Sequence, residues 1–145
     1  MKSLDLHLDS GRSFAIRGLL MLALTGAAVA VYGADLRLAG DQEVPPVKTT
    51  ASGSGTINVA NDGSVTGSVT TTGMTGTMAH IHAGGPGVNG PVIIPLTKSG
   101  DSMWNVPPGA KLNAEQMARY KAGDLYVNVH TEANKGGEVR AQLKP

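Results

Sequence analysis

The chain has 145 residues, no cysteine, 3% aromatic residues and a formal net charge of +1 at pH 7. This length suits one ordinary domain, and the near-neutral charge argues against a nucleic-acid partner, whose phosphates bind strongly basic surfaces. Without cysteine there are no disulfides, thiol nucleophiles or cysteine-ligated metals, so any metal ion must be held by histidine, methionine or carboxylate side chains.

The first 33 residues are typical of a secretory signal peptide. Basic residues precede an apolar run at residues 19–31, which is shorter than the roughly 20 residues that a membrane-spanning helix needs. Small residues follow, and we expect cleavage between about residues 30 and 34. The protein should therefore be exported to the periplasm or the extracellular space, with no membrane contact after cleavage. An uncleaved membrane anchor is the alternative interpretation.

Residues 34–145 form one expected domain in which apolar and polar side chains alternate, which is the period of β-strands. An Asn-Asp-Gly turn at residues 61–63 joins two of these strands into a hairpin. About seven short strands at this spacing predict an all-β, antiparallel, Greek-key-like β-sandwich. The expected strands cover residues 35–39, 56–59, 65–70, 77–83, 92–96, 125–131 and 138–143.

One segment departs from this alternation and predicts a short helix. Asn113 can cap its first turn, Gln116 stands where a capping box requires it, and Gly123 can end it. The helix should have roughly nine residues.

The three histidines of the domain fall on strand faces opposite to the apolar residues. His80 and His82 are two positions apart in the expected strand 77–83, so they share one face, while small and apolar residues take the other. The same alternation turns His130 outward in the expected strand 125–131. We therefore expect all three imidazoles on the outer surface of the sheet.

A His-x-His pair holds two imidazoles about 6–7 Å apart along a strand, and a histidine from a neighbouring strand can complete a metal site. The sequence thus predicts a surface metal site of His80, His82 and His130, if their strands are neighbours, which alternation does not decide. Imidazole suits copper, with zinc as the second candidate. The fourth ligand is open among Met78, Glu43, water and a partner. The alternative is three exposed histidines without a shared task.

Motifs for catalysis are absent from the sequence. There is no Gly-x-Ser-x-Gly elbow and no phosphate-binding loop. We assign no catalytic residue and favour a non-enzymatic role. Glu138 and Arg140 are two positions apart on one face, and their spacing predicts a surface ion pair.

Four ordered motifs carry a family resemblance: Leu-Ala-Gly-Asp-Gln-Glu-Val-Pro-Pro at residues 38–46, Ala-His-Ile-His at 79–82 followed by Gly-Pro-Val at 90–92, Gly-Asp-Leu-Tyr-Val-Asn-Val-His-Thr at 123–131, and Gly-Glu-Val-Arg-Ala-Gln-Leu at 137–143. With them the chain resembles the CHRD domain, named for chordin and also found alone in exported bacterial proteins. The resemblance implies a β-sandwich in the periplasm or cell envelope, with no established catalytic activity.

The His-x-His strand on such a sandwich is also similar to the copper strand of copper–zinc superoxide dismutases. This likeness concerns architecture alone, because three histidines are too few for the binuclear site of those enzymes.

Three hypotheses about function follow. The first is an exported protein that binds one copper ion through the three histidines, for copper carriage, buffering or delivery. The second is a metal-independent protein-interaction module of the cell envelope, which uses its outer faces and the glycine-rich loop at residues 84–91. The third is a mononuclear copper redox enzyme.

Overall fold

The computed structural model describes residues 31–145. The predicted signal peptide lies almost entirely outside these described residues, so its cleavage stays a prediction. The first strand, β1 (Val31–Ala39), begins before the expected residue 35 and inside the window assigned to cleavage. No helix within residues 31–145 is both long enough and apolar enough to cross a membrane.

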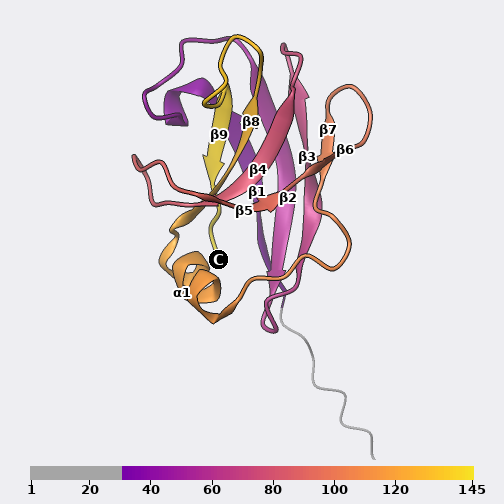
Figure 1. The fold of residues 1–145 in the computed structure, drawn as a ribbon, viewed down its shortest axis with the longest axis vertical. Coiled ribbons are helices and arrows are strands. Elements are labelled where there is room, and N and C mark those ends of the chain that lie inside the picture. The colour runs from indigo at the N-terminus through magenta and orange to yellow at the C-terminus, as the bar shows by residue number, and fades with distance from the viewer. Residues whose placement is uncertain (1–30) are drawn as a thin grey trace, which may run out of the picture.

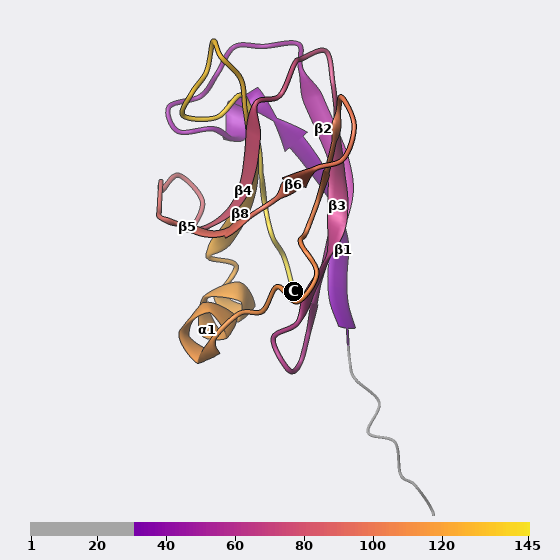
Figure 2. The ribbon, with the colours of Figure 1, turned by 45° about the vertical axis from the view of Figure 1, so that its right-hand side comes forward.

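The described residues form a nearly closed antiparallel β-sandwich with one short α-helix, which confirms the all-β prediction (Figure 1). The sheet order is β5-β4-β8-β9-β1-β2-β3-β7-β6. Figure 2 separates the two facing layers, one with β4 and β8 and the other with β1, β2 and β3. The strands after β1 are β2 (Ser52–Ala60), β3 (Val65–Thr72), β4 (Met78–Ala83), β5 (Val92–Pro95), β6 (Thr97–Lys98), β7 (Met103–Asn105), β8 (Leu125–His130) and β9 (Val139–Gln142).

Nine strands replace the expected seven within the described part of the chain. The two additional strands, β6 and β7, have two and three residues. Such short segments are too brief for a readable alternation of apolar and polar residues, which is why the sequence did not reveal them. A short 3-10 helix, η1 (Gly40–Gln42), follows β1.

The predicted helix is α1 (Ala114–Ala122), and its ends are as expected. The Asn113 side chain accepts a hydrogen bond from the Gln116 backbone N–H at 2.9 Å, and the Gln116 side chain accepts one from the Asn113 N–H at 2.9 Å. Gly123 ends the helix with φ = 80°, a left-handed conformation that glycine adopts without steric cost.

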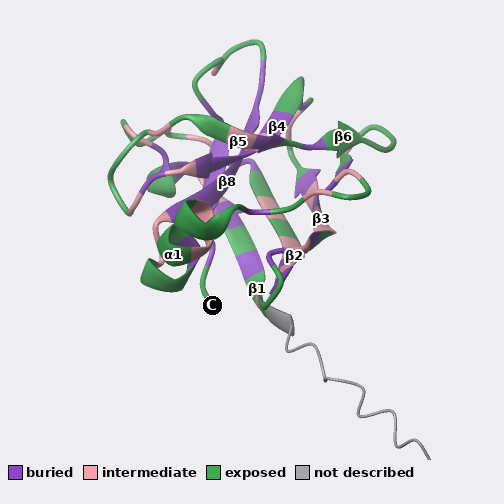
Figure 3. Cartoon of the chain, turned by 60° about the horizontal axis from the view of Figure 1, so that its bottom comes forward, coloured by how far each residue is buried: buried purple, intermediate pink, exposed green. Residues whose placement is uncertain are grey.

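The hydrophobic core lies between the two layers. Every residue of β8 is buried, and Figure 3 shows this strand in the colour of buried residues. Leu125, Val127 and Val129 of β8, together with Ala79 and Ile81 of β4, belong to the core. Because side chains alternate along a strand, the other residues of β8 point to the opposite face and are buried by something other than the core.

Candidate metal centre

The three histidines lie on two neighbouring strands, β4 and β8, which pair in antiparallel register. The sequence left open whether these strands meet, and the fold brings them together. Because the core takes one face of this pair, the histidines share the other with the residues opposite them. Three cross-strand pairs make up this shared face: Met78 with His130, His80 with Asn128, and His82 with Tyr126.

The three imidazoles converge on one point. One ring nitrogen from each of His80, His82 and His130 lies within 4.8 Å of the other two. His80 Nδ1 and His130 Nε2 lie 3.0 Å apart. Two nitrogens bound to one tetrahedral ion lie about 3.4 Å apart, given metal–nitrogen bonds of about 2.0–2.1 Å. The spacing of the three nitrogens is therefore of the order that one shared ion requires.

Two backbone carbonyls set the tautomers of the buried rings. His82 Nδ1 lies 2.9 Å from the Gly90 carbonyl oxygen, and His130 Nδ1 lies 2.8 Å from that of Lys135. A carbonyl oxygen only accepts hydrogen bonds, so each Nδ1 donates and each Nε2 keeps a lone pair. Metal-binding histidines in proteins are commonly oriented in this way.

The surroundings of the His82 Nε2 lone pair indicate whether the site fits a metal ion. His82 Nε2 is buried and has no hydrogen-bond partner among residues 31–145. A buried nitrogen without a partner loses its hydration and gains nothing in return. A metal ion bound between the three rings would supply the missing partner, so the residues present fit such an ion.

The prediction of a surface site is wrong in one respect. The imidazoles do leave the core face, but only 8% of His82 and 6% of His130 is exposed, and His80 is partly buried. The loops at residues 84–91 and 131–138 supply the carbonyls that bind His82 and His130, and so they cover this face. Alternation identifies the face of a sheet, but it carries no information about loops that fold over it.

Burial also keeps two of the three imidazoles neutral. Desolvation, followed by repulsion from His130 and His82, lowers the pKa of His80 to about 4. Desolvation lowers the pKa of His82 as well, although the hydrogen bond to the Gly90 carbonyl opposes it. These two rings are therefore neutral at physiological pH, which is the form that binds metal ions.

A stack of side chains continues from the histidines. The rings of His82 and Tyr126 are parallel within 4°, with centroids 4.7 Å apart. The guanidinium carbon of Arg140 lies 3.4 Å from the Tyr126 ring centroid. Arg140 is fully buried and donates hydrogen bonds to the carbonyls of Gly85 and Val88 at 2.9 and 3.0 Å. Arg140 thus secures the loop that covers His82.

The predicted surface ion pair of Glu138 and Arg140 is absent from residues 31–145, where both side chains are buried. Glu138 instead accepts hydrogen bonds from Thr131 and Asn134, while Arg140 is bound to loop carbonyls. Spacing on one face does not require contact when each side chain finds a nearer partner in a loop.

Glu43 and Met78, which the sequence offered as candidate fourth ligands, differ in their exposure and position. Glu43 is buried, with 3% of its surface exposed, but it lies outside the cluster of three histidines. Met78 is 50% exposed and stands opposite His130 at the rim of the shared face. No role was assigned from the sequence to Tyr126 and Asn128. Both lie on the same face of β8 as His130, at every second position, and this spacing could have identified them.

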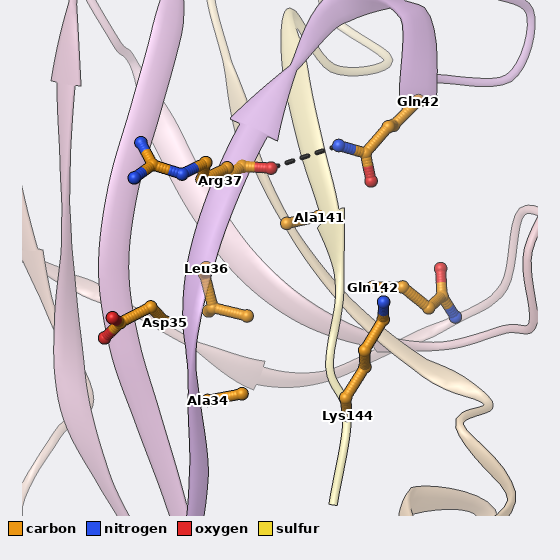
Figure 4. A pocket seen from close by; sticks show the side chains of 8 residues that line it. All are labelled: Ala34, Asp35, Leu36, Arg37, Gln42, Ala141, Gln142 and Lys144. Carbon is orange, nitrogen blue, oxygen red and sulfur yellow. Dashed lines mark hydrogen bonds between the residues drawn. The ribbon is translucent and has the colours of Figure 1, made fainter.

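A separate hollow of about 300 Å³ lies between β1 and the C-terminal segment (Figure 4). No histidine lines it. Figure 4 shows Asp35 and Arg37 on one side and Gln142 and Lys144 on the other, with their polar ends not directed at a common point. The hollow therefore offers no convergent set of catalytic or binding groups.

Fold and site together define an all-β sandwich domain with a loop-covered cluster of three histidines. The family model of the CHRD domain matches residues 35–143, so the chain belongs to the CHRD-domain family. Neither the curated proteins nor the solved structures contain a significant match to this chain.

Proposed function

We propose that this protein is exported and binds one copper ion through His80, His82 and His130, for copper carriage, buffering or delivery. The observation that carries the proposal is the buried His82 Nε2, which lacks a hydrogen-bond partner in the described part of the chain and belongs to a ring clustered with two further imidazoles. Its tautomer is already the one that a metal ion requires, because Nδ1 is bound to the Gly90 carbonyl.

The chemistry of the ligands favours copper. Three neutral imidazoles suit Cu(I), Cu(II) and Zn(II), and the general order of stability places copper(II) above zinc at a given nitrogen site. Met78 at the exposed rim offers a soft thioether on the route out of the site, which suits transfer of a monovalent copper ion. A three-histidine site with one open position supports binding and exchange and needs no catalytic group.

Export is supported by the character of the first 33 residues, which have basic residues before a short apolar run and small residues after it. The domain itself contains no cysteine. Its fold therefore requires no disulfide, and it is compatible with either a periplasmic or an extracellular environment.

Metal titration of the exported protein tests this function. Calorimetry should give one-to-one binding of copper, as Cu(II) in air or Cu(I) under reductant, with weaker binding of Zn(II). Replacing His82 with alanine should weaken copper binding by about 100-fold or more, because the substitution removes a metal ligand whose ring is already oriented by the Gly90 carbonyl. The matched control is Asn58→Ala on the distant strand β2, which should bind copper as the wild type does.

Two outcomes would reject the proposal. One is equal copper affinity in the wild type and in His82→Ala. The other is capture of the same envelope protein from extract with and without a chelator, together with weak copper binding, which would favour the protein-interaction module.

A further inference from the structure

Asn128 lies at the centre of the face that carries the three histidines. It stands directly opposite His80 in the register of β4 and β8, and it precedes His130 by two residues on the same face. Only 1% of its surface is exposed. An amide this deeply buried needs hydrogen-bond partners for both of its ends.

One end of the Asn128 amide has a partner, and this fixes the orientation of the group. Asn128 Nδ2 donates to the Gly136 carbonyl oxygen at 3.2 Å. Since a carbonyl cannot donate, the opposite orientation would set two acceptors against each other. The amide oxygen is thereby turned away from this loop carbonyl.

The oxygen of the Asn128 amide has no hydrogen-bond partner among the described residues. Asn128 Oδ1 is buried and makes no hydrogen bond within residues 31–145, as is also true of His82 Nε2. The two residues are diagonal neighbours on one face of the β4–β8 pair, because Asn128 stands opposite His80 and His82 follows His80 by two positions. Two unprotonated acceptors thus lie buried on one face, and each has lost hydration without gaining a hydrogen bond from the described residues.

A cation between these acceptors would satisfy both. His82 cannot satisfy the amide oxygen as a neutral ring, because its one proton is on Nδ1 and is donated to Gly90. A metal ion accepts electron pairs from imidazole nitrogen and from amide oxygen alike. The position of Asn128 opposite His80 also suits an ion that is already held by the histidines.

We propose that Asn128 Oδ1 is the fourth ligand of the ion bound by His80, His82 and His130, an inference that rests on the proposed function. The site is then closed on its buried side by three nitrogens and one oxygen. Met78, which is half exposed, is left outside the resting coordination shell and free to meet an incoming or departing ion.

The test is a crystal structure of the exported protein loaded with zinc or copper, together with the affinities of three variants. The expected distance from the ion to Asn128 Oδ1 is about 2.0–2.3 Å. Asn128→Leu should weaken metal binding by about 10- to 100-fold. The matched control is Asn58→Leu on the distant strand β2, which makes the same change of side chain and should bind zinc with unchanged affinity.

Asn128→Asp keeps the size of the side chain and an oxygen at the same place, so it remains informative if the leucine variant does not fold. The added negative charge should favour Cu(II) and Zn(II) over Cu(I) by about 10-fold or more relative to the wild type. An unchanged ratio of affinities would overturn the role of Asn128.

Different results would overturn the three-histidine site and the assignment of Asn128 as its fourth ligand. If the wild type binds one ion through the histidines while Asn128 Oδ1 lies beyond 3 Å and Asn128→Leu binds normally, the assignment of Asn128 alone is overturned. If the wild type binds no metal, the proposed function fails and this assignment fails with it.

Discussion

Glu43 is a carboxyl buried close to the site but outside the histidine cluster. Burial raises its pKa from 4.5 to about 7, although the positive charge of Arg140 opposes the change. Its Oε1 is buried without a hydrogen-bond partner in residues 31–145. Glu43 and the loop at residues 133–137 line one cavity, so the carboxyl lies below the same loop that covers His130.

The raised pKa of Glu43 predicts that the metal-free protein loses stability as the pH rises. Between pH 4.5 and about 7 the folded carboxyl keeps a proton that the unfolded chain releases, so ionisation favours unfolding. Glu43→Gln should therefore match the wild type near pH 4.5 and be more stable at pH 8, by up to roughly 3 kcal/mol. Urea unfolding at a series of pH values measures this difference.

The control for this measurement is Glu115→Gln on α1, which makes the same substitution at an exposed position. A difference between wild type and Glu43→Gln that stays constant from pH 4.5 to pH 8 would show that the carboxyl ionises normally in the folded protein.

The loop between β8 and β9 positions two residues of the site, because its carbonyls bind the side chains of His130 and Asn128. Glu138 secures this loop. Its carboxylate accepts a hydrogen bond from Thr131 Oγ1 at 2.9 Å and another from Asn134 Nδ2. Hydrogen bonds from Thr49 and then Asn134 lower the pKa of Glu138, so the loop is secured by an ionised group.

Glu138→Gln should destabilise the fold by about 1.5–3 kcal/mol at pH 7, the range for hydrogen bonds to a charged group. The stabilisation by Glu138 is present above its ordinary pKa of 4.5 and is lost as the pH falls through the lower folded value. The variant and the wild type should therefore converge in acid. Thermal or urea unfolding at pH 7 and pH 3 tests this.

The matched control for the loop is Glu132→Gln, whose side chain is 83% exposed and pairs only at the surface with Lys135. It should change stability by well under 1 kcal/mol. Equal losses in the two glutamine variants would contradict an anchoring role for Glu138.

At the scale of the whole molecule, the histidine cluster joins elements that are distant in the chain. His80 and His130 are fifty residues apart and belong to different strands, and separate loops hold His82 and His130. An ion bound to all three would link β4, β8 and both loops. Metal binding should therefore stabilise the fold as a unit.

Copper or zinc at 100 times its dissociation constant should stabilise the folded state by about 2.7 kcal/mol. For a domain of this size the melting temperature should rise by roughly 10 °C. Differential scanning calorimetry with metal and with a chelator measures the change. The same rise in His82→Ala would mean that the ion acts at another site.

Local patterns along the chain were sufficient to predict the class of fold. Alternation identified the strands and the face on which each histidine lies, because side-chain direction depends only on position within the strand. The capping box of Asn113 and Gln116 was predictable for a similar reason, since its hydrogen bonds join residues three positions apart. The three candidate ligands were likewise apparent from spacing.

The tertiary structure decided which strands are neighbours and what covers the histidines. Pairing of β4 with β8 depends on the packing of the entire sandwich, and alternation within either strand is the same whatever its partner. The burial of Glu43, Asn128 and Arg140 depends on loops folded over the sheet, which leave no periodic signal. The sequence by itself therefore determined the residues that could bind a metal, and only long-range packing determined that they meet in one largely buried cluster.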